Sequence, residues 1–416
     1  MAEFFRLRNQ VKHSDWGSAH FIPALLGVPS DGKPWAEMWM GSHPALPSKV
    51  RLPGGELVGL GEFVARDASR YLGEKIAHGV CGKEPAGGPL PYLLKLLAAE
   101  KPLSIQAHPS LELAREGFAR ENAQGLSLCA PSRNYRDPNH KPEMVCALAP
   151  FAGMCGFREP EEIARLLAAF LDGPRGAEPA PASLRAGFSP LLRALEASPA
   201  ASALRGFLSA LFDFPASLRD ELTRFVVSRG EGAEGAGCEW GLMRGFARQH
   251  PGDPAAIAPL YLNVFRLQPG EAIFLKPGTL HAYVSGFAVE LMACSDNVLR
   301  GGLTSKRVDV PELLRALDFS PHKPRIMKPE RGSPSFVYPV SCDDFSLAVM
   351  RGAGGAAAFA PDGPSVCIVT EGEASIGADA LRAGESFFVP PVGASEKPLE
   401  LRGTYVLYVA SSGKPE

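Results

Sequence analysis

The sequence predicts a mainly β protein with an inserted helical block, on three observations. Glycine and proline are frequent, with 44 and 39 residues among 416, which is typical of short strands joined by many turns. Short apolar runs bounded by Pro-Gly turns occur on both sides of the middle of the chain. Between them, hydrophobic residues recur with helical spacing. We therefore expect β structure before and after a helical insertion.

The helical block extends from Glu159 to about His250. Its apolar residues form three stripes, which are Ile163, Leu166, Leu167, Phe170 and Leu171, then Leu204, Phe207, Leu208 and Leu211, then Leu218, Leu222, Phe225 and Val226. Pro160 suits a first helical turn, and its acidic neighbours suit a helix N-terminus. The Pro- and Gly-rich segments 173–183 and 229–237 predict loops within the block.

An internal repeat links the two β-rich parts. PGEAIFLKPGTLH at 269–281 is similar to AGESFFVPPVGASE at 383–396, and each reads as a turn, a four-residue apolar strand, a Pro turn and a polar residue. Two related β-barrels are expected, since closing a barrel removes exposed sheet edges. The second copy has Glu396 where the first has His281, so a ligand held through His281 is expected in the first barrel only.

Composition and charge restrict the partners of this chain. A net charge of -2, from 43 basic and 45 acidic residues, provides no basic field for nucleic acid or anionic lipid. The N-terminal segment lacks the pattern of a signal peptide, and no apolar run approaches the length of a transmembrane helix. No heptad pattern favours assembly. We expect a cytoplasmic monomer with no nucleic-acid or membrane partner.

Three segments carry side chains suited to a metal. In PLSIQAHPS, alternation directs Gln106 and His108 to the same side of a strand. Glu143 begins an apolar run after a proline, and His281 follows a Pro-Gly turn. Singly, each histidine is more often a structural residue than a ligand. Together, two imidazoles and a carboxylate are the ligand types of a catalytic zinc site, to which Gln106 would add a neutral oxygen.

A fourth segment, DNVLRGGLTSK, supplies Arg300 and Lys306. A permanently charged guanidinium can hold phosphate or enediolate oxygens through its planar fork. The alternative is structural: both cations could form ion pairs with Asp296 or Asp309 in a surface turn.

Six motifs in order carry a resemblance to a known family. They are WAEMWMGSHP, KPLSIQAHPS, NYRDPNHKPEM, FAGMCGFR, PGTLHAYVSG and SDNVLRGGLTSKRVDV. With NQVKHSDWGS near the N-terminus, they resemble the type I mannose-6-phosphate isomerases, also called phosphomannose isomerases, over residues 4–160 and 255–320. The resemblance implies an enzyme that interconverts mannose 6-phosphate and fructose 6-phosphate through a cis-enediol, with one Zn²⁺ per chain.

The resemblance also implies domains and site residues. A jelly-roll, cupin-type catalytic domain would comprise 1–155 and 255–325, with a helical insert at 156–254 and a C-terminal cupin-like barrel without metal at 326–416. The zinc ligands of the family fall on Gln106, His108, Glu143 and His281, and its essential arginine on Arg300. Positions lining its cleft fall on Lys95, Ser104, Lys141, Tyr283, Glu290, Asp296 and Lys306.

The implied reaction moves a proton between two carbons and needs an acid/base, a stabilised enediolate and a phosphate anchor. Glu290, Lys141 and a zinc-bound water are the three candidates for the acid/base, and the sequence does not choose among them. Lys306 and Lys141 are candidate phosphate contacts. Two other functions stay open: a non-catalytic cupin that binds sugar phosphates, and an iron-dependent cupin oxygenase, against which Gln106 in place of a histidine argues.

Overall fold

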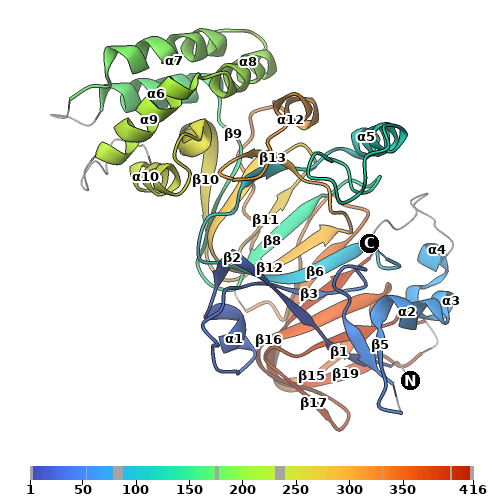
Figure 1. Cartoon of the computed structure of the whole chain (residues 1–416). Helices are drawn as coiled ribbons and strands as arrows, with labels where there is room; N and C mark the ends of the chain where they lie inside the picture. The colour runs from blue at the N-terminus through green and yellow to red at the C-terminus, as the bar shows by residue number, and fades with distance from the viewer. Residues whose placement is uncertain are drawn as a thin grey trace.

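The computed structural model describes residues 3–52, 54–77, 88–173, 178–229, 239–330, 332–393 and 396–412. Two large antiparallel sheets form most of the molecule, and the helices of residues 160–249 gather at one end of it (Figure 1). The predicted mainly β fold with a helical insertion is confirmed. No described helix combines the length and the hydropathy that crossing a bilayer requires.

The first sheet has ten strands. They are β2 (Gln10–Ser18), β3 (Trp35–Met40), β6 (Tyr92–Ala99), β7 (Ile105–Ala107), β8 (Glu143–Ala147), β9 (Phe151–Phe157), β10 (Leu262–Leu267), β11 (Ala272–Leu275), β12 (His281–Ala293) and β13 (Leu299–Gly302). The long strand β12 pairs with β7 and β9 near its start and with β6 and β8 near its end. Gly286 lies between these halves at φ +121°, where a Cβ would lie 2.4 Å from the Pro150 carbonyl oxygen. The register of β12 against β9 shifts just before it, between Tyr283 and Ser285, and the sheet as a whole curls into a half-barrel (Figure 1).

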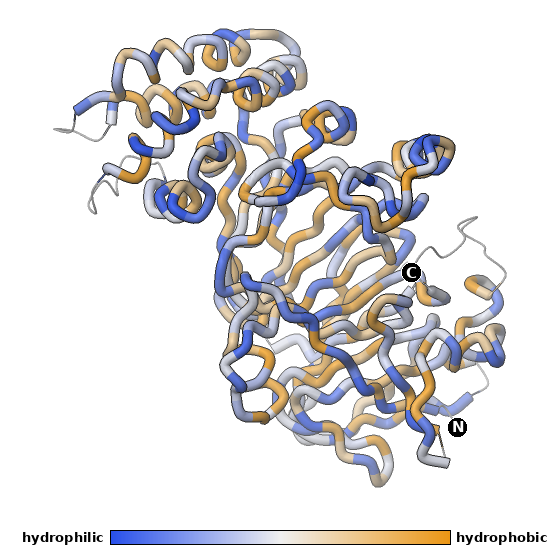
Figure 2. Tube along the Cα trace, in the orientation of Figure 1, coloured by the Kyte–Doolittle hydropathy of each residue, from blue (hydrophilic) through white to orange (hydrophobic). Residues whose placement is uncertain are grey.

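Alternation along the strands separates the inside of the curled sheet from its outside. In β8, Met144 and Cys146 pack into a core shared with the C-terminal sheet. Val145 and Ala147 pack into the inner core, so Glu143 at the start of the strand also faces inward. Figure 2 shows hydrophobic residues concentrated along the strands of both sheets, in keeping with this burial on two faces.

The second sheet has nine strands. They are β1 (Phe5–Arg8), β4 (Lys49–Arg51), β5 (Leu57–Gly59), β14 (Ser335–Val337), β15 (Ser346–Phe359), β16 (Ser365–Ile376), β17 (Asp379–Arg382), β18 (Ser386–Val389) and β19 (Leu399–Ser411). Strand β1 pairs with β18 and with β4, so three N-terminal strands belong to the C-terminal sheet. The predicted 1–155 segment is thus divided between the two sheets, although the domain boundaries themselves stay a prediction. Pairings across more than 370 residues leave no local signal in the sequence.

The internal repeat corresponds to matching strands up to its last residue. Strands β11 and β18 are the two four-residue apolar strands, and the next strand after each is a long one, β12 and β19 respectively. His281 is the first residue of β12 and is buried. Glu396 is exposed and precedes β19, which begins at Leu399.

The helices are mostly peripheral to the two sheets (Figure 1). They are α1 (Phe21–Leu25), α2 (Leu60–Ala65), α3 (Ala68–Leu72), α4 (Glu74–Ala77), α5 (Leu111–Ala123), α6 (Pro160–Asp172), α7 (Ala182–Leu195), α8 (Ala200–Phe212), α9 (Ala216–Ser228), α10 (Trp240–Gln249), the 3-10 helix η1 (Pro254–Ile257), α11 (Ala258–Tyr261) and α12 (Val310–Ala316). The three predicted stripes lie on α6, α8 and α9, and all their residues are buried except the half-buried Leu218. Most of the two predicted loops, at 174–177 and 230–237, lies outside the described residues.

The helical block shares its core with the first sheet. Ile105 and Ala107 of β7 belong to the same cluster of buried residues as the apolar faces of α6 to α10. This packing turns the outer face of β7 toward the helices, so Gln106 faces the opposite way, toward the inside of the sheet.

Candidate metal centre

Three of the predicted ligands meet inside the curled sheet. One side-chain donor atom from each of His108, Glu143 and His281 lies within 4.8 Å of the others. The His108 Nε2 is 3.2 Å from Glu143 Oε1, and the His281 Nε2 is 3.3 Å from Glu143 Oε2. All three residues are buried, with exposed fractions of 1–3%.

The local backbone explains how residues distant in sequence converge. Glu143 is the first residue of β8 and His281 the first of β12. The turn before His281 contains Gly278, whose φ of +83° suits glycine and whose N–H donates to the His108 carbonyl at 2.7 Å. The turn that presents one histidine therefore also holds the backbone of the other.

Each histidine is oriented by a hydrogen bond from its second ring nitrogen. The His108 Nδ1 donates to the Asn297 carbonyl at 2.7 Å, and the His281 Nδ1 donates to the Thr279 carbonyl at 2.9 Å. Both Nε2 atoms, and Glu143 Oε2, are buried without a hydrogen-bond partner among the described residues. Buried atoms that carry a lone pair and have no hydrogen-bond partner fit a metal cation. Imidazoles oriented by a backbone carbonyl are also typical of metal ligands.

The electrostatics keep His108 and Glu143 in their metal-binding protonation states. Burial, followed by the charge of Lys141, lowers the pKa of His108 to about 4. Burial alone would raise the pKa of Glu143, but Lys141, whose Nζ is 2.7 Å from Oε1, and His108 together hold it well below its usual value. At neutral pH the site presents a carboxylate and a neutral imidazole, as a divalent metal requires.

His281, Gln106 and Arg300 lie side by side on three neighbouring strands. In the strand register, Gln106 lies opposite His281 on one side and opposite Arg300 on the other. Directly opposed residues of antiparallel strands share a face. Gln106 therefore lies on the same inner face as His281, next to the metal cluster, and Arg300 lies one strand further out.

Beside the metal cluster lies a chain of buried charges. The Lys95 Nζ is 3.0 Å from Glu37 Oε1 and 3.0 Å from Glu290 Oε2. Lys12, half exposed, reaches Glu37 Oε2 at 3.1 Å. Burial lowers the pKa of Lys95 less than Glu290 and Glu37 raise it, so this ammonium group stays charged. Burial, followed by the charge of Glu143 among others, raises the pKa of Glu290.

Sequence reasoning missed two members of this chain, Lys12 and Glu37. Lys12 lies in NQVKHSDWGS, and Glu37 lies in WAEMWM, where the sequence alone names no partner for it. Its role is visible only once β3 pairs with β6, which sets Glu37 and Lys95 on neighbouring strands.

We predict that Glu37→Gln flattens the acid dependence of stability. Burial raises the pKa of Glu37, but the charges of Lys95 and Lys12 outweigh it and lower the pKa from 4.5 to about 2. A carboxyl with a depressed pKa stabilises the fold above its unfolded pKa, here by about 3 kcal/mol, and loses this as the pH falls through the folded value. The free energy of unfolding, measured with urea, should fall less steeply between pH 6 and pH 3 in the variant than in the wild type. Parallel curves would contradict the assignment.

The other predicted site residues lie in different surroundings. Tyr283 is buried, and its hydroxyl has no hydrogen-bond partner among the described residues. Ser104 is half-buried, just before β7. Asp296 lies 3.5 Å from the His43 Nε2 through its Oδ2, and His43 lowers its pKa to about 2 although burial opposes this.

The structural alternative for Arg300 and Lys306 is wrong. Asp309 accepts hydrogen bonds from Arg307 and Asn134, and Asp296 faces His43. Within the described part of the chain, neither Arg300 nor Lys306 forms an ion pair. The sequence showed which charged residues lie in this region, but not which of them form ion pairs with one another.

The comparisons with known proteins all find mannose-6-phosphate isomerases, also called phosphomannose isomerases. The model of the phosphomannose isomerase type I catalytic domain matches residues 4–160. The mannose-6-phosphate isomerase of Escherichia coli (strain K12) is 35% identical over 405 residues, spanning 96% of this chain and 97% of its own. That of Homo sapiens is 36% identical over 361 residues, spanning 82% of this chain and 79% of its own. A crystal structure of zinc-bound mannose 6-phosphate isomerase superposes with a TM-score of 0.83 at 34% identity, covering 99% of this chain and 100% of that one.

Fold and site together define a metal-dependent enzyme built on a cupin-type β fold. With relatives above 30% identity across nearly the whole length, the chain belongs to the type I phosphomannose isomerase family. The resemblance stated from the sequence motifs is therefore confirmed.

Proposed function

We propose that this protein interconverts mannose 6-phosphate and fructose 6-phosphate with one zinc ion held by Gln106, His108, Glu143 and His281. The observation that carries the proposal is the buried His-Glu-His cluster, whose three metal-facing atoms have no other partner among the described residues. A neutral glutamine oxygen as the fourth ligand would leave the site with net positive charge. That charge suits a sugar phosphate that becomes an enediolate.

Glu290 is the acid/base in this proposal. Burial is the first cause of its raised pKa, and a carboxyl with a raised pKa is better suited than an ordinary one to both take and return a proton. It would remove the proton from C2 of mannose 6-phosphate and deliver it to C1, while the proton of the C2 hydroxyl passes to the C1 oxygen by way of the cis-enediol; fructose 6-phosphate would follow the reverse order. Lys141 suits this role less well, because its ammonium group already contacts Glu143 at 2.7 Å.

The remaining charges would stabilise the enediolate and hold the substrate. Bound zinc would supply positive charge that polarises the substrate oxygens. Lys95, 3.0 Å from Glu290, and Lys141 bring two buried ammonium groups to the same inner face. Arg300 and Lys306 would hold the anionic end of the substrate, while Ser104, Tyr283 and Asp296 would line the cleft. We also propose that the protein acts as a monomer in the cytoplasm.

A coupled assay on mannose 6-phosphate tests this function. Zinc-loaded protein should turn over the substrate, a chelator should abolish turnover, and added Zn²⁺ should restore it. A folded, zinc-loaded protein without turnover would favour the non-catalytic sugar-phosphate binder. Restoration by Fe²⁺ and not by Zn²⁺ would favour an iron enzyme.

A further inference from the structure

Three cations lie on segments next to the metal cluster and have no acidic partner among the described residues. They are Arg136, Arg300 and Lys306, of which Arg136 and Lys306 are exposed and Arg300 is half-buried. Among the described residues, none of the three side chains makes a hydrogen bond or an ion pair; Arg136 and Lys306 are bonded only through their backbone N–H groups. By contrast, Arg120, Arg307 and Arg315 in the same region each form an ion pair with a carboxylate.

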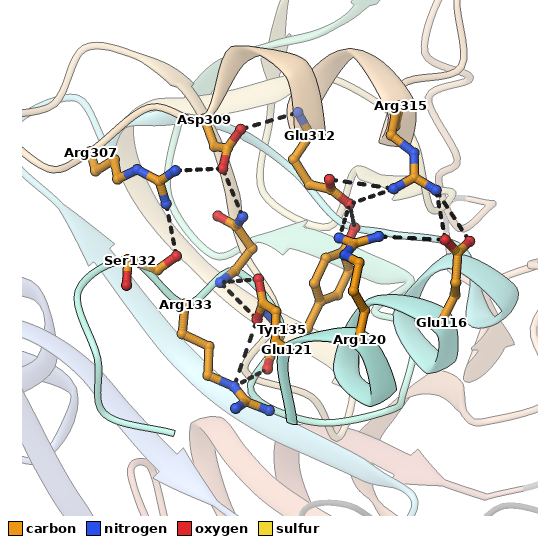
Figure 3. Close-up of polar contacts among 11 residues, drawn as sticks. Glu116, Arg120, Glu121, Ser132, Arg133, Tyr135, Arg307, Asp309, Glu312 and Arg315 are labelled. Carbon is orange, nitrogen blue, oxygen red and sulfur yellow. Dashed lines mark hydrogen bonds and ion pairs between the residues drawn. The ribbon is translucent and has the colours of Figure 1, made fainter. Parts of the chain in front are cut away.

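Two chain segments that carry these cations are fastened to each other. Arg307, next to Lys306, donates to the Ser132 carbonyl at 2.7 Å and to Asp309 at 2.8 Å. Asn134, two residues before Arg136, donates to the same Asp309 carboxylate at 3.0 Å. Figure 3 shows this clamp, with Asp309 between the two segments. The backbone of Arg136 is thereby held against the loop that carries Lys306.

A separate contact ties Arg136 to the strand that carries Arg300. The Arg136 N–H donates to Asn297 Oδ1 at 2.7 Å, and Asn297 lies three residues before Arg300. The carbonyl of Asn297 also orients the ligand His108. Asn297 therefore contacts both the backbone of Arg136 and the imidazole of His108, and it lies in the segment that leads into the strand of Arg300.

The charges of the three residues act on one another. Burial, followed by the charge of Arg136, lowers the pKa of Arg300. Burial, then Arg300, Lys12 and Arg136, lowers the pKa of Lys306, and the opposing effect of Asp15 is smaller. Like charges brought together without a counterion destabilise the free protein, and a bound anion would relieve this.

The segment under Arg136 is rigid. Glu121 of α5 accepts hydrogen bonds from the backbone N–H groups of Asn134 and Tyr135 at 2.9–3.2 Å. The Tyr135 hydroxyl donates to Glu312 of α12 at 2.6 Å, as Figure 3 also shows. Gly117 leaves room for the tyrosine ring, because a Cβ there would lie 2.3 Å from it. Binding at Arg136 therefore needs no further ordering of the backbone, and only its side chain has to be fixed.

We propose that Arg136 is a further substrate-binding residue, which joins Arg300 and Lys306 in holding the phosphate of the hexose phosphate. Arg300 lies two strands from His281 in the register, or about 10 Å at the usual strand spacing. Arg300 is thus separated from His281 by the kind of span that a six-carbon sugar covers between its reacting carbons and its phosphate. This inference rests on the proposed function and names the phosphate end of the same site.

Steady-state kinetics of Arg136→Gln and Arg136→Lys test the inference. Arg136→Gln should raise the KM for mannose 6-phosphate by about tenfold or more, since it removes a charged hydrogen-bond donor. The kcat and the zinc content should stay near the wild-type values, because Arg136 does not touch the reacting carbons. Arg136→Lys should recover part of the lost affinity. The matched control is Arg325→Gln, which removes an exposed arginine from a separate cavity lined by Lys276 and Asp344.

Binding of inorganic phosphate to the zinc-loaded protein separates this inference from the proposed function. Calorimetry should show phosphate affinity reduced by about tenfold or more in Arg136→Gln and unchanged in Arg325→Gln. Equal KM and equal phosphate affinity in Arg136→Gln and wild type would overturn the inference. If the wild type fails to turn over mannose 6-phosphate but binds phosphate through Arg136, the proposed reaction is wrong and the anion site stands.

Discussion

Arg300→Ala is expected to reduce kcat by about a hundred- to a thousandfold while zinc content stays near one per chain. Arg300 lies on the inner face, opposite Gln106, and forms no ion pair within the described part of the chain. Its removal therefore breaks no ion pair there and leaves the three clustered ligands in place. What the variant loses is the permanent positive charge that holds the phosphate, and with it the placement of the reacting carbons at the metal. Metal analysis and steady-state kinetics on the same preparation measure both quantities.

Arg300→Lys provides the matched control. It keeps the charge but not the planar fork, so we expect activity between that of the alanine variant and the wild type. Loss of zinc in Arg300→Ala would contradict the account, because it would place Arg300 among the groups that hold the metal.

His281→Ala is expected to weaken zinc binding by more than the ten- to hundredfold that loss of an outer-shell partner costs. The variant removes a direct donor and leaves Glu143 Oε2 facing an empty volume. Turnover should fall with metal content, and excess zinc should restore it only in part. Competition with a chromophoric chelator measures the affinity.

Glu396→Ala is the control for His281→Ala, because Glu396 occupies the matching position of the internal repeat. It is exposed and lies before β19, so its removal should leave zinc affinity unchanged. Metal loss in this variant would overturn the prediction that the second barrel holds none.

Local patterns in the sequence predicted most of the fold and much of the site. The stripe from Ile163 to Leu171 gave α6 its buried face, because helical periodicity is a local property. Glu143 and His281 lie at strand starts, where the preceding proline and Pro-Gly turn placed them. Alternation in PLSIQAHPS correctly directed Gln106 away from the helices, although β7 ends at Ala107, before His108.

The interactions that could not be predicted depend on pairing across long sequence distances. Glu37 gains its partner Lys95 only through the pairing of β3 with β6. Arg136 lies within a recognised motif and precedes Asp137, but that carboxylate bonds to Ser295 and Asn297 instead, which the local sequence does not show. The N-terminal strand β1 joins a sheet formed by the last residues of the chain. Register, loop contacts and ion-pair choice are set by tertiary packing, which local residue patterns do not encode.

Zinc titration of chelator-stripped protein, with mannose 6-phosphate turnover measured at each step, tests the central claim most directly. The account predicts negligible turnover without metal, then a linear rise that saturates at one Zn²⁺ per chain. Full turnover by the stripped protein, or saturation at a different ratio, would contradict it.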